Sequence, residues 1–422
     1  MDTLSNLVKK YNDTSLILRI FIGLIIGAIV GLAAPQWTAF GLFGDVFVGC
    51  LKAIAPILVF VLIASALCSG SSKLDKRFGL VLWLYMISTF LAAFIATVAS
   101  FLFKVKMVLP EAPEGDAAPP SGLGEVLQNL LLNVVKNPVE SLATANYIGI
   151  LFWAAFLGIA FKMLASEHTC QMLHDLADSV SQIVRWIINL APFGIMGLVY
   201  GSVSTSGLGI FKDYGKLIVL LVGCMFFVAL VIDPLLAAIT LKRNPYPLVF
   251  RCLKNSGLTA FFTRSSAANI PINMSLCEKL KLDPDMYSVS IPLGATINMD
   301  GAAITITIMT LATANTLGIQ VDLPTAIILS FIAALGACGA SGVAGGSLLL
   351  IPMACALFGI SNDIAMQAVG VGYIISVVQD SVETALNSSG DVMFAATAEY
   401  HAWQKQGKSL PKFLGGETET DV

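Results

Sequence analysis

Long runs of hydrophobic residues, separated by short polar segments, follow one another along most of the chain. In the first part of the chain they occupy residues 16–34, 43–67, 78–103, 147–164, 183–200 and 217–241. Runs of this length suit helices that cross the roughly 30 Å hydrocarbon core of a bilayer. No alternating strand pattern repeats along the chain. Because backbone polar groups in lipid must be paired internally, we predict helical spans.

The first run allows two interpretations. A basic start with Lys9 and Lys10, followed by small residues at 31–33, resembles a secretory signal peptide. The run is long for a signal core, contains Arg19 and precedes many further spans. We therefore interpret it as an uncleaved first span of a protein in an inner or plasma membrane.

After Arg243 the hydrophobic runs become shorter, and polar or glycine-rich clusters interrupt them. The first cluster is 263–266, between arms of roughly 14 residues that would reach about 21 Å, too short to cross. The second is 339–347, between equally short arms. We predict a re-entrant helical hairpin at each. Irregular backbone at this depth must be buried in protein or line a wet cavity.

Each predicted hairpin precedes a helix with a polar break, at 298–301 and at 387–391. This order suggests an internal repeat, and parity along the chain makes the second copy inverted. Inverted repeats that meet near the membrane midplane are typical of secondary transporters. The predicted fold is an all-α polytopic membrane protein with eight transmembrane helices and two re-entrant hairpins.

Basic residues mark one side of the membrane. They gather at Lys9 and Lys10, in the loop 73–77, at Lys242 and Arg243, and in the tail after residue 400. The positive-inside rule places these segments, and both termini, in the cytoplasm. The loop 110–120 is rich in proline and acidic residues, and we expect it to be a solvated linker.

Composition supports a membrane protein and excludes several other classes. Hydrophobic residues make up 56% and charged residues 12% of the 422 residues, and the net charge is −3. Soluble domains carry roughly 25% charged residues. The balance of charges excludes a basic nucleic-acid-binding protein and an acidic disordered chain.

The chain contains eight cysteines without a CxxC pair and three histidines without ligand spacing. We interpret these residues as structural residues rather than as disulfides or metal ligands.

The last predicted span contains the densest group of polar residues. At about 100° per residue, Asp380, Thr384, Asn387 and Asp391 fall within one narrow stripe, and Glu383 lies at its edge. An ionised aspartate at a helix centre costs roughly 2.5–3.5 kcal/mol on insertion scales. Polar contacts between helices are the structural alternative. Several carboxylates on one stripe favour a binding site.

Asp300 lies in a second candidate site. Gly294 and Gly301 bracket it, and glycine allows a helix to unwind and expose its carbonyl oxygens. A simple helix kink is the alternative. Carboxylate, amide and carbonyl oxygens without His or Cys suit Na⁺ rather than a soft transition metal.

The two hairpin tips offer further polar groups. Ser265, Ser266 and the glycines of the second tip carry hydroxyl and free amide groups that suit the carboxylate of a substrate. Arg264 has three possible roles: pairing with Asp380, pairing with Glu383, or holding the substrate. The chain contains neither a GxxxxGK[ST] motif for ATP nor a GxSxG nucleophile motif, so an ion gradient must supply the energy. An ion channel is a rival interpretation, because polar re-entrant loops also build selectivity filters.

The motifs 263–266 (TRSS) and 293–301 (LGATINMDG), with the series Asp380, Asn387 and Asp391, resemble the dicarboxylate/amino acid:cation symporter family, which includes glutamate transporters. The resemblance covers nearly the whole chain. It implies a homotrimer with a scaffold formed by 1–77 and 111–210, a mobile transport domain formed by 78–110 and 211–398, and a cytoplasmic tail, 399–422. It also implies elevator-type movement, with no cofactor beyond Na⁺ as coupling ion.

The same resemblance implies specific ligand sets. One sodium ion would bind Gly294, Asn298, Asn387 and Asp391. A second would bind backbone oxygens of Thr296, Met299, Ala337, Cys338 and Ala340. A third would bind Tyr85, Ser88, Thr89, Asn298 and Asp300. The substrate would lie between Ser266, Val343, Asp380, Thr384 and Asn387, with its amino group on Asp380.

Three departures from the acidic-substrate members change the expected substrate. Those members carry arginine, threonine and glycine where this chain has Glu383, Ala302 and Ser347. The arginine grips a side-chain carboxylate, which a glutamate would repel. We therefore expect sodium-coupled uptake of L-serine and L-threonine. Glu383 either accepts a hydrogen bond from the substrate hydroxyl or neutralises Arg264. A proton-coupled or exchange-type transporter of small neutral amino acids is the alternative.

Overall fold

The computed structural model describes residues 14–68, 76–109, 128, 131–340 and 344–420. These parts consist of helices joined by turns and irregular segments, and they contain no strand beyond an isolated bridge between Pro411 and Thr418. Within them, six helical segments are long and apolar enough to cross a membrane, and one bent pair, Glu167–Ile188 with Ala191–Thr205, would make a seventh. The all-helical, polytopic membrane architecture is therefore confirmed.

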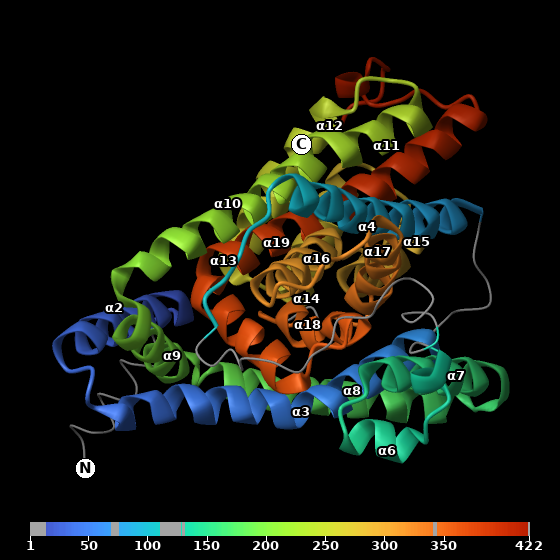
Figure 1. Ribbon diagram of the computed structural model, residues 1–422. Coiled ribbons are helices and arrows are strands. Elements are labelled where there is room, and N and C mark those ends of the chain that lie inside the picture. Colours follow the sequence, from blue (N-terminus) through green and yellow to red (C-terminus); the bar gives the residue numbers. More distant parts are fainter. Residues whose placement is uncertain (1–13, 69–75, 110–127, 129–130, 341–343, 421–422) are drawn as a thin grey trace, which may run out of the picture.

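Two groups of helices form the molecule (Figure 1). The first is built along the long helix α3, and we call it the α3 group. Its members are α2 (Leu16–Ala33), η1 (Thr38–Phe40), α3 (Gly41–Cys68), α6 (Pro138–Ala143), α7 (Tyr147–Leu164), α8 (Glu167–Ile188) and α9 (Ala191–Ser206). Figure 1 shows these helices at its lower edge and left side.

The second group surrounds the 44-residue helix α19, and we call it the α19 group. It is linked to α9 by η2 (Gly207–Gly209). Its members are α4 (Lys76–Leu102), α10 (Ile210–Phe227), the π-helix η3 (Val228–Ile232), α11 (Asp233–Leu241), α12 (Tyr246–Cys252), the π-helix η4 (Leu253–Gly257), α13 (Leu258–Thr263), α14 (Ser266–Lys279), α15 (Pro284–Ile297), α16 (Asp300–Thr316), α17 (Leu323–Ala337), η5 (Ser347–Leu350), α18 (Ile351–Cys355), η6 (Ala356–Phe358), α19 (Asn362–Lys405) and η7 (Lys412–Leu414).

Glycines set the distance between α2 and α9. A Cβ atom added to Gly23 would lie 2.2 Å from the carbonyl oxygen of Pro192, and one added to Gly27 would lie 2.3 Å from that of Met196. Such contacts bring two backbones together where lipid offers no hydrophobic drive for helix association.

The predicted fifth span, a single helix over 183–200, is wrong. Helix α8 ends at Ile188 and α9 begins at Ala191, with a bend of 55° between them. Pro192 lies in the first turn of α9, where its missing N–H costs nothing, and it cannot continue the hydrogen bonds of α8. The N-terminal part of α8 is rich in polar residues, so the hydrophobic run in the sequence includes only the last residues of this helix.

Two pairs of short helices fold back on themselves where the sequence predicts hairpins. In the first pair, Ser256 of η4 donates to Asn273 of α14 over 2.5 Å, and the chain reverses at Arg264 in a left-handed conformation. In the second pair, a Cβ on Gly336 of α17 would lie 2.1 Å from the Met353 side chain of α18. Residues 341–343, including Val343, lie outside the described residues, as do Lys9, Lys10, Lys73 and the acidic linker.

The predicted break at 298–301 is present, but the one at 387–391 is not. The helix is interrupted at Asn298 and Met299, between α15 and α16. In contrast, α19 continues unbroken through 387–391. Partners on other helices bind the polar side chains of this stretch, so a single glycine, Gly390, does not end the helix.

The interpretation of all cysteines as unpaired is wrong for two of them. Cys68 at the end of α3 and Cys170 in α8 form a disulfide, with Cα atoms 5.9 Å apart. Their separation of 102 residues carried no pairing signal in the sequence. Four others, Cys224, Cys252, Cys277 and Cys355, are buried thiols.

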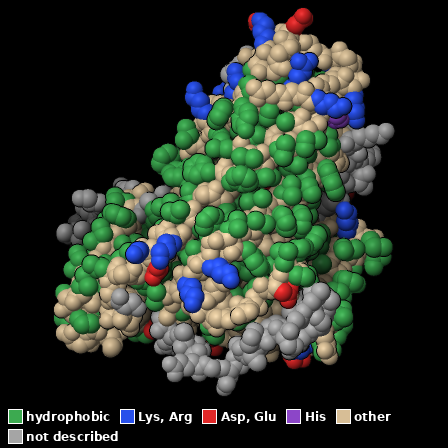
Figure 2. All heavy atoms as spheres, turned by 45° about the horizontal axis from the view of Figure 1, so that its top comes forward, with side chains coloured by type: hydrophobic (Ala, Val, Ile, Leu, Met, Phe, Trp, Pro, Cys, Tyr) green, Lys and Arg blue, Asp and Glu red, His purple; other side chains and the backbone are tan. Residues whose placement is uncertain are grey.

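The outer surface matches a lipid-facing protein. Figure 2 shows a broad hydrophobic face with few charged side chains, and Lys and Arg gather mostly at its upper end. Large exposed hydrophobic residues on α2 and α3 include Phe21, Ile29 and Leu42, each more than half exposed.

We predict that Gly27→Ala destabilises the protein, because the new methyl group would overlap the carbonyl of Met196. Overpacking of this kind costs about 1–3 kcal/mol. The matched control is Gly79→Ala in α4, where a Cβ meets no atom within 4 Å. Thermal unfolding in detergent should show a lower midpoint for Gly27→Ala only. Equal midpoints would mean that α2 and α9 do not depend on this close approach.

Candidate functional site

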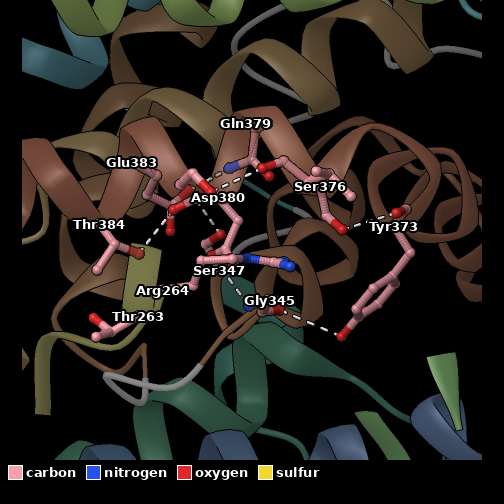
Figure 3. Close-up of polar contacts among 12 residues, drawn as sticks. Thr263, Arg264, Gly345, Ser347, Tyr373, Ser376, Gln379, Asp380, Glu383 and Thr384 are labelled. Carbon is pink, nitrogen blue, oxygen red and sulfur yellow. Dashed lines mark hydrogen bonds and ion pairs between the residues drawn. The ribbon is translucent and has the colours of Figure 1, made fainter. Parts of the chain in front are cut away.

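Both hairpin tips meet α19 in the interior of the α19 group (Figure 3). At the first tip, Arg264 has φ 53°, which turns the chain between α13 and α14. Ser265 caps α14 by accepting the N–H of Ala268 at 3.2 Å. Ser266, the first residue of α14, is buried beside it.

Arg264 and Asp380 form a buried ion pair. The Arg264 Nε atom lies 2.6 Å from Asp380 Oδ2, and both side chains are less than 7% exposed. The second tip also contacts this aspartate, because the backbone N–H of Gly345 donates to Asp380 Oδ1 at 3.1 Å. Gly345 has φ 72°, a conformation that favours glycine. Asp380 thus joins both tips to α19.

Glu383 lies one turn further along α19 and has a different environment. Its Oε2 atom accepts hydrogen bonds from Thr305 of α16 at 2.7 Å and from Ser347 of the second tip at 3.0 Å. Gln379 donates to the same oxygen. Of the three roles considered for Arg264, the structure has the pair with Asp380, and it records no ion pair for Glu383 among the described residues.

The remaining residues predicted for the substrate lie around this pair. Thr384 is buried and donates to the carbonyl of Asp380 within the helix, at 2.8 Å. Asn387 accepts the backbone N–H of Gly301 at 2.8 Å, at the start of α16. Val343 lies outside the described residues.

A second polar cluster forms at the break between α15 and α16. Asp300 Oδ1 accepts from Ser88 at 3.0 Å and from Thr89 at 2.8 Å, both on α4. Its other oxygen, Oδ2, is buried without a hydrogen-bond partner in the described chain. Asn298 bridges this cluster to α19, because its Nδ2 donates to Asp391 Oδ1 at 3.1 Å and to the carbonyl of Asn387 at 3.1 Å.

Asp391 has a similar arrangement. Its Oδ2 atom is buried and has no partner among the described residues, and Tyr85 donates to its backbone carbonyl at 3.0 Å. A Cβ on Gly294 would lie 2.7 Å from Asp391 Oδ1 and 2.8 Å from the Tyr85 hydroxyl. Only glycine allows α15 to approach this carboxylate so closely.

The residues of the set predicted from backbone oxygens lie at the break between α15 and α16 and at the end of α17. The thiol of Cys338, at the end of α17, donates to the carbonyl of Ile297 at 3.5 Å, so the second hairpin adjoins the helix break. The backbone N–H of Met299 donates to Thr89 at 3.3 Å. Ala337 and Ala340 are buried, whereas Thr296 is exposed.

Sequence reasoning missed the partners of Glu383. Gln379 precedes Glu383 by four residues and therefore shares its helix face, a signal that could have been used. Thr305 lies in an apolar stretch, Ala302–Met309, that alternates with threonines, and nothing local marks it as a contact of α19.

The donor set suits a hard monovalent cation. Two carboxylate oxygens without partners lie among hydroxyl, amide and backbone oxygens, and these are the ligands that such cations prefer. Within the described residues, no three His, Cys, Asp or Glu side chains form a group that could hold a metal ion. A sodium ion therefore fits these residues better than a transition metal.

Comparison with known proteins gives consistent matches. The model of the sodium:dicarboxylate symporter family matches residues 16–400. The chain is 64% identical over 409 residues to the serine/threonine transporter SstT of Bifidobacterium adolescentis, covering 97% of this chain and 95% of that protein. It is 58% identical over 398 residues to the protein of the same name from Streptococcus thermophilus, covering 94% and 99%. The corresponding protein from Streptococcus agalactiae is 57% identical over 399 residues, covering 94% and 99%.

We predict that Arg264→Met strongly destabilises the protein, because it leaves the buried Asp380 carboxylate without its cation. Breaking one side of a buried pair costs about 3–5 kcal/mol. The double variant Arg264→Met/Asp380→Leu should recover at least half of the loss in thermal unfolding midpoint. The matched control is Lys216→Met, which removes an exposed pair with Asp213 and should cost under about 1 kcal/mol. If Arg264→Met and Lys216→Met lowered the unfolding midpoint equally, the buried ion pair would contribute no more to stability than the exposed pair.

Proposed function

Because the chain belongs to the sodium:dicarboxylate symporter family, we propose that it imports L-serine and L-threonine together with sodium ions. It is a transporter and not an enzyme. Relatives named serine/threonine transporter SstT align over nearly the whole chain, which supports these substrates. With no ATP-binding motif in the sequence, the sodium gradient supplies the energy.

The environment of Glu383 is the observation that favours a neutral substrate. This carboxylate lies between the second tip and α16, where Ser347 and Thr305 donate to it. An acidic substrate would bring a second negative charge to this point, and two like charges in a buried site repel strongly. A hydroxyl group would instead donate a hydrogen bond to Glu383. L-serine and L-threonine both carry such a hydroxyl.

The substrate would bind between the two tips and α19. Its ammonium group would replace the Gly345 N–H at Asp380 Oδ1, which requires the second tip to open. Its carboxylate would bind the hydroxyls and amides at the first tip, near the unpartnered Nη1 atom of Arg264. The proposed set is Arg264, Ser265, Ser266, Val343, Ser347, Asp380, Glu383, Thr384 and Asn387.

Three sodium sites are proposed around the helix break. The first uses Gly294, Asn298, Asn387 and Asp391, and the third uses Tyr85, Ser88, Thr89, Asn298 and Asp300. The buried, unpartnered oxygens of Asp391 and Asp300 support these two sites. The second uses backbone oxygens of Thr296, Met299, Ala337, Cys338 and Ala340, and the contact of Cys338 with Ile297 supports it.

We propose that the two helix groups act as the two parts of an elevator-type transporter. In this proposal 1–77 and 111–210 form a fixed scaffold, and 78–110 with 211–398 form the transport domain. The transport domain would have two re-entrant hairpins, and the whole chain eight spans, in a homotrimer in the bacterial inner membrane. The tail 399–422 and both termini would be cytoplasmic. Substrate and sodium would together stabilise the closed second tip, so that only the empty or the fully loaded domain would cross.

We predict that the protein reconstituted in liposomes accumulates radiolabelled L-serine under an inward sodium gradient, and that excess L-aspartate leaves this uptake intact. By linkage, removing sodium should weaken serine binding at least tenfold, about 1.4 kcal/mol. Uptake that does not depend on a sodium gradient but does depend on a pH gradient would support the proton-coupled alternative. Non-saturable flux without stereospecificity would support a channel.

We predict that Glu383→Arg lowers the kcat/KM for L-serine at least tenfold, because it removes the hydroxyl acceptor and places a cation near Arg264. The variant should gain measurable L-aspartate uptake. The matched control is Glu383→Gln, which keeps an acceptor oxygen for Thr305 and Ser347 and should lose less activity. Unchanged serine uptake by Glu383→Arg would mean that Glu383 does not contact the substrate.

A further inference from the structure

Asp233 is a buried acidic residue to which the proposed transport cycle gives no role. It lies inside the membrane-spanning segment Gly207–Leu241 and is 2% exposed. It is the first residue of α11 and directly follows the π-helix η3. A π-helical turn changes which side of a helix the following residues face, and such turns are frequent at functional sites.

The carboxyl group of Asp233 contacts that of Asp300. The Oδ1 atom of Asp233 and the Oδ2 atom of Asp300 are both buried, and no other described residue donates a hydrogen bond to either of them. The opposite oxygen of Asp300 is held by Ser88 and Thr89. The structure therefore brings two carboxyl groups within hydrogen-bonding reach of each other and leaves an oxygen of each without a donor from any other described residue.

Among the described residues, no Lys or Arg lines the cavity that adjoins Asp233. This cavity has a volume of about 10 Å³, with room for one water molecule. Apolar side chains, including Val249, Leu253 and Leu386, line much of it. Two adjoining carboxylates in such surroundings repel each other and are poorly solvated. A cation between them would offset both costs.

We propose that Asp233 and Asp300 bind one sodium ion between their carboxylates, so that α11 supplies a ligand to the sodium site on Asp300. This inference rests on the proposed sodium coupling. The hydroxyls of Ser88 and Thr89 and the amide oxygen of Asn298, which lies 3.4 Å from Ser88 Oγ, complete a set of hard oxygen donors. Sodium bound here ties α11 to α4 and to the start of α16.

The test is sodium-dependent thermal stabilisation of the purified full-length protein without amino acid. Sodium chloride replaces choline chloride at constant ionic strength. Asp233→Asn and Asp300→Asn should each raise the sodium concentration for half-maximal stabilisation at least tenfold. The double variant should add little, because both residues hold the same ion. The matched control Asp213→Asn, on the exposed start of α10, should keep the wild-type midpoint.

The outcomes separate this inference from the proposed function. Asparagine keeps the size of Asp233, one oxygen and a hydrogen-bond donor for Asp300. A wild-type sodium midpoint for Asp233→Asn would therefore overturn the inference while leaving sodium coupling intact. If Asp233→Asn does not fold, Asp233→Ser provides the same test. A wild-type protein that sodium does not stabilise would overturn both.

Discussion

A charge or polar group inside an apolar layer must be matched by an opposite charge or by several hydrogen bonds, and the α19 group is organised by this requirement. Asp380 is matched by Arg264, and Glu383 by three donors from α16, α19 and the second tip. Apart from the contact of Gln379 with Glu383 inside α19, these interactions join segments that lie far apart in the sequence. The interactions that compensate these buried charges are therefore also interactions that hold the fold together.

Hydrogen bonds between neutral side chains also hold the first hairpin against α19. Ser388 of α19 lies between Asn269 and Asn273 of α14, which donate to it at 2.8 and 3.0 Å. Ser256 of η4 joins the same cluster. All four residues are buried. These hydrogen bonds link η4, α14 and α19 through four buried side chains, so the hairpin and α19 are expected to move together.

The sequence was informative where a pattern repeats or where a local rule is strong. Run length identified α3, α7 and the long segment through α10 and α11, and the short arms around 263–266 identified the first pair of folded-back helices. The bend between α8 and α9 was missed because the hydropathy of a long run is an average, and a single proline such as Pro192 hardly changes it. The break in α19 was expected wrongly, because tertiary partners such as Asn269 and Asn298 stabilise a polar stretch in helical form. The pairing of Cys68 with Cys170 and the contact between Asp233 and Asp300 depend on tertiary packing, which no local pattern encodes.

The unbroken course of α19 has a consequence for how this segment can change in evolution. The helix carries Asp380 and Glu383 at one level and Asn387 and Asp391 at the next, with about 16 Å of helix between the first and the last. One inserted or deleted residue between them would rotate the two levels by about 100° relative to each other. The side chains of Asp380 and Glu383 and those of Asn387 and Asp391 could then not all face the interior. Substitutions can adjust either level separately, but the number of residues between the levels cannot vary.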